Sequence, residues 1–175
     1  MQPEPETPQG SETPVQPQIT YIQGDATQPQ GDGPKILAHV CNDAGIWEHP
    51  FELSLSRRWP EPERSYRAWA SVIVGIRKGK LPLGMGQLVS VQPHLWVMNM
   101  IALRAPRRPL DVPPIEYPAL EQSLQLAAEC AISLSASIHM PYIGSGPLRG
   151  CWHLVAPVIE RVLCAQGVPV FVYSE

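Results

Sequence analysis

Short apolar runs rich in valine, isoleucine and leucine recur along the chain from Ile19 onward. Each run has the length of a strand and is bounded by glycine, proline, asparagine or aspartate, as expected of buried strands. The runs predict six strands, at Ile19–Ile22, Ile36–Cys41, Gln87–Val91, Leu95–Ala102, Ile138–Ile143 and Val168–Tyr173.

The segments between these runs carry apolar residues three or four positions apart, the spacing of one face of a helix. They predict helices at Phe51–Trp59, Glu61–Ser71, Pro118–Leu134 and Cys151–Cys164. Pro157 is expected to kink the last helix unless it lies in the first turn. Strands that alternate with helices predict an α/β fold whose sheet is covered on both faces. Such folds bind their ligands at the carboxyl ends of the strands.

The first residues have a different composition. Met1–Gln18 is rich in proline, glutamate, glutamine and threonine and has almost no aliphatic side chains. Such a segment cannot bury enough apolar surface to offset the entropy lost on ordering. We therefore expect a disordered tail over 1–18 and a single domain over 19–175, a length that suits one hydrophobic core.

Charge is balanced in the expected domain. Without the three glutamates of the tail, the 16 acidic residues fall to 13, which equals the 13 lysines and arginines. A neutral domain lacks the excess of positive charge that duplex nucleic acid recruits, so we expect no such partner. The apolar runs fall short of the roughly 20 residues that cross a bilayer. The four cysteines show no C-x-x-C spacing, and we expect a cytoplasmic protein without a membrane partner.

Two loops that follow predicted strands could meet a nucleotide. In the first, Gly24–Thr27 (GDAT), the Asp25 carboxylate could accept a hydrogen bond from an amine such as adenine N6, although such residues also form ordinary turns and helix N-caps. In the second, Ile143–Gly150 (IGSGPLRG), glycines let successive N–H groups approach an anion, although a tight connection fits the same sequence. It is not a P-loop, because no Gly-Lys-Ser/Thr follows.

A third loop, His39–Pro50 (HVCNDAGIWEHP), gathers side chains that can bind metals or act as nucleophiles. We nevertheless expect no metal site, because His39 would point into a core strand and no second metal-spaced pair exists. Cys41 and His139 are interpreted as packed strand residues rather than as a catalytic dyad. Asp43 and His49 are candidates for activating a water molecule, although loop carboxylates are more often simply solvated.

Taken together, these loops resemble those of the macrodomain family. The resemblance runs from about Ile19 to Ser174 and rests on GDAT at 24–27, AHVCN at 38–42, LSRRWP at 55–60, MPYIGSG at 140–146 and VFVY at 170–173. The branch it resembles most is that of the ADP-ribosylglutamate hydrolases and yeast-type ADP-ribose-1″-phosphate phosphatases. The resemblance implies an α/β class fold, a three-layer α/β/α sandwich with a mixed sheet of about six strands, and ADP-ribose lying across the strand ends.

The resemblance also implies which residues bind the ligand. Asp25 would bind the adenine amine, Tyr173 would border the adenosine, and the glycine-rich loop would hold the diphosphate through its backbone. The full expected set is Asp25, Ala26, Asn42, Gly45, Trp47, Phe51, Ile143, Gly144, Ser145, Gly146, Leu148 and Tyr173. The partner would be ADP-ribose or an ADP-ribosylated protein, bound by a monomer that needs no cofactor.

The chain departs from the family pattern near the presumed phosphate site. Glu48 and Pro50 stand where glycines are expected: the carboxylate would repel a diphosphate unless it turns toward water, and proline removes an N–H donor. Related hydrolases use a lysine and an aspartate. The matching positions here are Ser90 and Leu148, which can neither form a Schiff base nor exchange protons. We expect an ADP-ribose binder, with a hydrolase of ADP-ribosyl esters and a domain that has lost its ligand as alternatives.

Overall fold

The computed structural model describes residues 18–77, 79–105, 115–143 and 152–174. Within these ranges the chain forms every strand and helix that its sequence predicts. The strands are β1 (Thr20–Gln23), β2 (Lys35–Asn42), β3 (Gly86–Gln92), β4 (Leu95–Leu103), β5 (Ser137–Pro141) and β6 (Val170–Ser174). The helices are α1 (Pro50–Arg58), α2 (Glu61–Arg77), α3 (Tyr117–Leu134) and α4 (Trp152–Val162), and a short 3₁₀ turn, Cys164–Gln166, follows α4.

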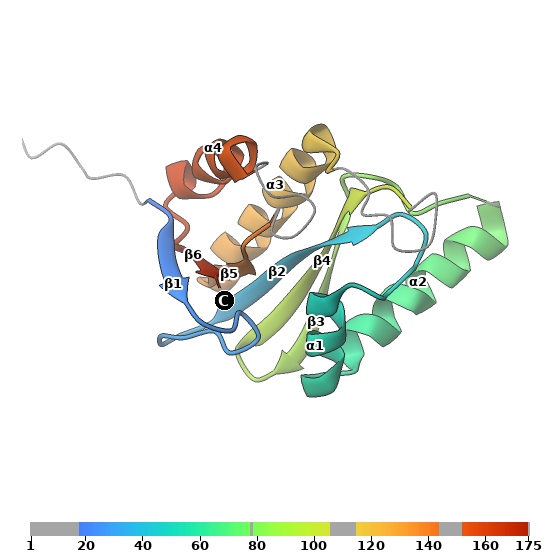
Figure 1. Ribbon diagram of the computed structural model, residues 1–175, viewed down its shortest axis with the longest axis horizontal. Helices are drawn as coiled ribbons and strands as arrows, with labels where there is room; N and C mark the ends of the chain where they lie inside the picture. The colour runs from blue at the N-terminus through green and yellow to red at the C-terminus, as the bar shows by residue number, and fades with distance from the viewer. Residues whose placement is uncertain (1–17, 78, 106–114, 144–151, 175) are drawn as a thin grey trace, which may run out of the picture.

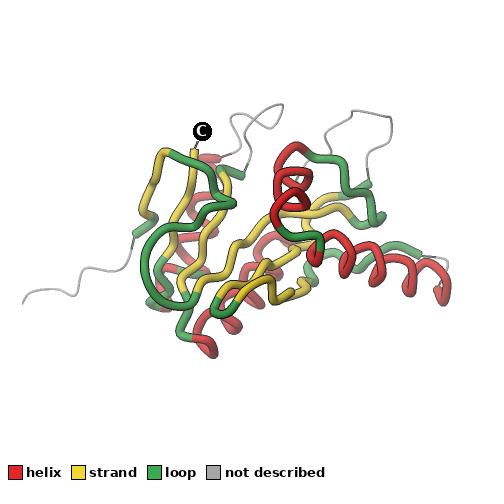
Figure 2. Tube along the Cα trace, turned by 90° about the horizontal axis from the view of Figure 1, so that it is seen from below, coloured by secondary structure: helices red, strands yellow, loops and turns green. Residues whose placement is uncertain are grey.

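The strands form one mixed sheet in the order β1-β6-β5-β2-β4-β3. All neighbours are parallel except β3, which runs antiparallel to β4 at one edge. Helices α3 and α4 lie on one face of the sheet and α1 and α2 lie on the other (Figures 1 and 2). The predicted α/β class and the three-layer arrangement with a mixed six-stranded sheet are therefore confirmed.

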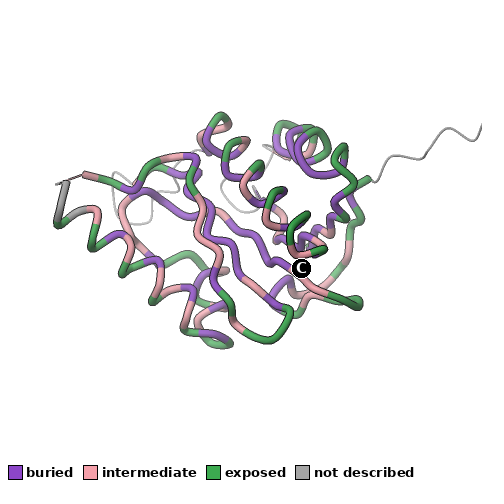
Figure 3. The backbone as a smooth tube through the Cα atoms, turned by 180° about the vertical axis from the view of Figure 1, so that it is seen from behind, coloured by how far each residue is buried: buried purple, intermediate pink, exposed green. Residues whose placement is uncertain are grey.

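The central strands are continuous apolar runs, without alternating polar residues, because both of their faces are buried. In β2, Ile36 and Ala38 pack under α3 and α4, whereas Leu37 and Cys41 face α1 and α2. Figure 3 shows the buried backbone concentrated in the middle of the sheet. The two faces thus form two separate apolar cores, and each strand of the centre supplies side chains to both.

Two helices differ from the expectation. Helix α2 continues to Arg77 instead of ending near Ser71. Ile73 in this added part packs against the apolar core, although β-branched residues and Gly75 have low helix propensity. Pro157 lies inside α4, past the first turn. The carbonyl that loses its N–H partner belongs to His153, and both residues are exposed, so water can replace that hydrogen bond. Among the described residues, no helix has the length and apolar character needed to cross a bilayer.

Candidate functional site

The carboxyl ends of the parallel strands meet at one edge of the sheet. Strands β1, β6, β5, β2 and β4 run in the same direction, so their last residues and the loops after them lie on that side. The GDAT turn follows β1, the His39–Pro50 loop continues from β2, and Ile143 follows β5. Gly144, Ser145, Gly146 and Leu148 of the expected ligand set lie outside the described residues. The described part of the site therefore consists of the first two loops and the strand ends beside them.

Asp25 holds the GDAT turn together and still reaches solvent. One carboxylate oxygen accepts hydrogen bonds from the backbone N–H of Thr27 at 2.8 Å and from its hydroxyl at 2.7 Å. The other accepts from the Gln28 amide at 3.1 Å and lies 4.0 Å from Arg58 of α1. Burial opposes ionisation, but these hydrogen bonds and the Arg58 charge outweigh it and hold the pKa of Asp25 below its ordinary value. Because the side chain is 40% exposed, this carboxylate can accept one more donor from a ligand.

Asn42 shapes the loop after β2 from within. Its side-chain oxygen accepts the backbone N–H groups of Ala44 at 3.0 Å and Ile46 at 3.2 Å, and its amide donates to the Ile46 carbonyl at 2.6 Å. The Tyr66 hydroxyl of α2 donates to the Asn42 carbonyl at 2.5 Å. Asn42 is 9% exposed, and its side chain already bonds to the loop itself. This residue of the expected ligand set therefore fixes the loop.

Glu52 occupies the N-terminal end of α1. One of its carboxylate oxygens accepts the backbone N–H groups of Glu48 at 2.9 Å and His49 at 2.8 Å, which is the side-chain half of a capping box. Pro50 is the first residue of the helix, where the missing N–H costs nothing. Glu48 is exposed and points its charge to solvent-accessible space. Because Glu52 takes two backbone donors and Pro50 lacks one, this loop offers few N–H groups to a phosphate.

Three other expected ligand residues differ in accessibility. Trp47 was expected in the ligand set, but it is 1% exposed and belongs to the core, where its indole N–H donates to the Glu52 carbonyl at 3.0 Å. Phe51 is half-buried and its ring centre lies 5.7 Å from that of His39. Gly45 has φ +77, and a Cβ at this position would lie 2.6 Å from the Cβ of Ala70 in α2. Glycine at 45 is therefore required by both conformation and space.

The two residues expected to activate water lie in different surroundings. Asp43 is 2% exposed, and its carboxylate accepts the backbone N–H of Ala105 at 2.7 Å and lies 3.8 Å from the Lys80 amine. It thereby ties the loop after β2 to the end of β4. His49 is exposed at the start of α1, and partial burial of its ring lowers its pKa. Asp43 has the geometry of a loop anchor rather than of a base facing open solvent.

A chain of buried polar groups links the loop after β1 to the middle of the sheet. The Tyr173 hydroxyl accepts the Gln30 N–H at 2.9 Å and lies 2.9 Å from Nδ1 of His139, whose Nε2 lies 2.8 Å from the Ser137 hydroxyl. Burial raises the pKa of Tyr173, and burial together with the Lys35 charge lowers the pKa of His139 to about 4. Tyr173 thus positions the loop that carries Asp25.

Ala26, Ile143 and Tyr173 of the expected set are all nearly buried, at 4%, 4% and 3% exposure. Their side chains pack into the two apolar cores. A ligand at this edge of the sheet would therefore meet their backbone atoms rather than their side chains.

The comparison of Ser90 with a catalytic lysine is wrong. Ser90 is exposed on β3 and pairs with Trp96, near the start of β4. Since β3 runs antiparallel to the other strands, this part of it lies at the amino edge of the sheet, away from the loops described above. Of the pair β3 and β4, it is β4 that runs toward the carboxyl edge, where it ends at Leu103. Neither Leu103 nor the following Arg104 carries an amine that could form a Schiff base.

Sequence reasoning missed a cluster that the fold assembles. His39, Cys41 and Glu52 lie with a ring nitrogen, the sulfur and a carboxylate oxygen all within 4.8 Å of one another, and all three residues are buried. The spacing of His39 and Cys41 placed them on one face of β2, but nothing in the sequence pattern identified Glu52 as their neighbour. Its charge within an amphipathic helix was typical of a solvated position.

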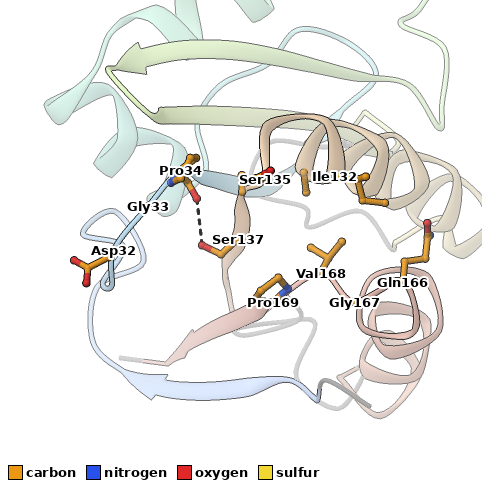
Figure 4. A pocket seen from close by; sticks show the side chains of 12 residues that line it. Asp32, Gly33, Pro34, Ile132, Ser135, Ser137, Gln166, Gly167, Val168 and Pro169 are labelled. Carbon is orange, nitrogen blue, oxygen red and sulfur yellow. Dashed lines mark hydrogen bonds between the residues drawn. The ribbon is translucent and has the colours of Figure 1, made fainter. Parts of the chain in front are cut away.

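A cavity of about 320 Å³ lies at the opposite edge of the sheet, among the residues that precede β2, β5 and β6 and the end of α3. Figure 4 shows Asp32 pointing away from the other residues that line it, while Ile132, Val168 and Pro169 give it an apolar wall. The Ser137 hydroxyl donates to the Pro34 carbonyl at 3.5 Å within it. Because few polar side chains converge there, this cavity lacks the features of a ligand site.

No model of a protein family matches the sequence. A solved structure of a macrodomain protein from Streptomyces coelicolor is 42% identical, with a TM-score of 0.78, and the match covers 90% of this chain and 99% of that one. The chain belongs to the macrodomain family. A second solved structure, of a protein of unknown function from Bacteroides thetaiotaomicron, is 39% identical to this macrodomain over 90% of its chain and 98% of the other, with a TM-score of 0.80.

More distant proteins resemble the chain in sequence or in structure. Chromodomain-helicase-DNA-binding protein 1-like of Mus musculus is 25% identical over 158 residues, and this match spans 89% of the macrodomain but only 17% of the mouse protein. A structure of Thermosipho africanus DarTG in complex with ADP-ribose is 15% identical with a TM-score of 0.65, and it covers 89% of this chain and 41% of that one.

Proposed function

We propose that this macrodomain binds ADP-ribose, or an ADP-ribosyl group on a protein, across the carboxyl ends of its parallel strands. The observation that carries the proposal is the position of Asp25. It follows β1 at that edge, its carboxylate is ionised and 40% exposed, and its turn is fixed by Thr27. An exposed acceptor at a strand end can receive the amine of an adenine ring.

The fold family supports the same ligand class. The DarTG structure that shares this fold holds ADP-ribose, and ligands of open α/β sheets bind at the edge where the Asp25 turn and the loop after β2 lie. Because Glu52 and Asn42 already use backbone donors of the loop after β2, the diphosphate would depend mainly on the glycine-rich loop that follows Ile143. The proposal is a binding function, since the Lys80 amine at this edge is paired with the Asp43 carboxylate at 3.8 Å.

The first prediction concerns the ligand. ADP-ribose should bind, and AMP should bind much more weakly, because the diphosphate joins two subsites that are each weak alone. Isothermal titration calorimetry with both compounds measures the difference. A macrodomain that binds neither compound would contradict the proposal and would indicate a domain that has lost its ligand.

The second prediction concerns Asp25. Asp25→Ala should weaken ADP-ribose binding by about 5- to 150-fold, the equivalent of about 1–3 kcal/mol for a charged acceptor. Asp25→Asn should keep the hydrogen bond to the Thr27 N–H but lose the charge, and it should fall between the parent and the alanine variant. Asp32→Ala, at the other edge of the sheet, is the matched control and should bind as the parent does. Equal affinity of parent and Asp25→Ala would exclude the adenine assignment.

A further inference from the structure

The hydrogen bonds of Asp25 decide where a ligand amine can reach its carboxylate. An ionised carboxylate has about four acceptor positions, two on each oxygen. The N–H and hydroxyl of Thr27 take both positions of Oδ1, at 2.8 and 2.7 Å, and the Gln28 amide takes one position of Oδ2, at 3.1 Å. Among the described residues no other hydrogen bond reaches this carboxylate, so the position left for a ligand belongs to Oδ2.

Arg58 faces the same oxygen without occupying that position. Its Nη2 lies 4.0 Å from Oδ2 of Asp25, which is beyond the hydrogen-bond range of about 2.7–3.2 Å. Both side chains are 40% exposed. In the part of the chain that the structure describes, the guanidinium donates no hydrogen bond, so the N–H groups of its planar fork are available. A ligand that reaches Oδ2 from solvent therefore also meets Arg58.

Both side chains extend from backbone that is fixed in the core. Arg58 is the last residue of α1 and precedes Trp59, which is 8% exposed. Asp25 precedes Ala26, which is 4% exposed, and Trp59 and Ala26 belong to the same apolar core. The acceptor and the donor are thus placed next to each other before a ligand arrives, which lowers the entropy that binding costs.

An acceptor beside a donor matches one edge of an adenine ring. The exocyclic amine of adenine donates through N6, and the ring nitrogens on its two sides, N7 and N1, are acceptors. The separation of 4.0 Å between Oδ2 of Asp25 and Nη2 of Arg58 lets each atom lie about 3 Å from one of two neighbouring groups of the ring. A charged donor also makes a stronger hydrogen bond to a ring nitrogen than a neutral donor does.

We infer that Arg58 recognises the base together with Asp25, by donating a hydrogen bond to N7 or N1 of adenine while Asp25 accepts the N6 amine. The inference rests on the proposed function and adds a second contact at the adenine end of the ligand. The base is then recognised by two adjacent groups, a donor and an acceptor, rather than by its amine alone. Arg58 contacts the ligand directly and does not act only through its ion pair with Asp25.

Two analogues of ADP-ribose test this contact, one with carbon in place of N7 and one with carbon in place of N1. In calorimetric titrations of the full chain, one analogue should bind the parent about tenfold more weakly than ADP-ribose, because it lacks the acceptor for Arg58. Arg58→Ala should bind ADP-ribose about tenfold more weakly and should no longer distinguish that analogue from ADP-ribose. Loss of the ion pair alone would not remove this distinction. The melting temperature should change little, because exposed ion pairs contribute little to stability.

Arg161→Ala is the matched control, because Arg161 is an exposed arginine of α4 in an ion pair with Glu121 at 2.8 Å. It should bind all three compounds as the parent does. A parent that binds ADP-ribose and both analogues equally overturns the inference and leaves the proposed function in place. An Arg58→Ala variant that still distinguishes the analogue, or that binds ADP-ribose as tightly as the parent, has the same meaning. A parent that binds no ADP-ribose overturns the proposed function and the inference with it.

Discussion

Gly45→Ala should lower the free energy of unfolding by about 2–5 kcal/mol, since a side chain here costs about 1–2 kcal/mol for its left-handed conformation and about 1–3 kcal/mol for overpacking. The backbone at Gly45 has φ +77, and the new Cβ would lie 2.6 Å from the Cβ of Ala70. Neither atom belongs to a flexible side chain, so α2 or the loop must shift. Urea denaturation monitored by tryptophan fluorescence measures the loss.

A matched glycine separates these two contributions. Gly167 has φ +79, but no atom lies within 4 Å of the place where its Cβ would stand. Gly167→Ala should therefore cost only the conformational part, about 1–2 kcal/mol. Adding Ala70→Gly should restore part of the stability of Gly45→Ala and none of that of Gly167→Ala. Equal losses in the two alanine variants would show that the contact with α2 relaxes without cost.

Acid should destabilise the folded domain through His139. This side chain is 0% exposed, and burial and the Lys35 charge lower its pKa to about 4. Between pH 6.5 and 4 the unfolded chain takes up a proton that the folded chain excludes, so stability falls as the pH falls through this window. The full difference corresponds to at most about 3 kcal/mol. Above pH 6.5 the neutral ring keeps its contacts with Tyr173 and Ser137.

Replacing the ring by an uncharged amide tests this account. As the pH falls from 6.5 to 4, the free energy of unfolding of His139→Gln should decrease by up to about 3 kcal/mol less than that of the parent. Urea denaturation of both proteins over pH 4–8 gives this difference. Measurements at pH 8, where the histidine is neutral in both states, supply the constant cost of the substitution itself. Parallel pH profiles for the two proteins would contradict a neutral buried His139.

The fold could be predicted from the sequence because local and tertiary preferences agree over most of the chain. The apolar runs are buried from both sides, so strand length and composition were sufficient to find them. The end of α2 could not be placed, because Val72, Ile73 and Gly75 disfavour a helix when judged alone. Pro157 also disfavours a helix when judged alone, so its place inside α4 could not be predicted. It is tolerated there because it is exposed.

The candidate site was predictable at the level of loops but not of individual side chains. Asp25 has an accessible carboxylate, whereas the side chain of Trp47, which the family resemblance includes in the ligand set, packs in the core. Glu52 was missed because a capping box is recognised from serine or threonine three residues earlier, and His49 stands there. The comparison of Ser90 failed because sequence order does not show which strand is antiparallel. The ligand contacts of the glycine-rich loop stay predictions.

The place of β1 in the sheet has a consequence for how the chain folds during synthesis. Strand β1 is an edge strand whose partner is β6, with Thr20 opposite Phe171 and Gln23 opposite Ser174. Strand β1 therefore leaves the ribosome long before β6, and it cannot pair until β6 has been made. Closing such a long loop is slow compared with forming local structure. The β5-β2-β4-β3 part of the sheet can assemble earlier, so the turn that carries Asp25 would be among the last parts of the molecule to take its final form.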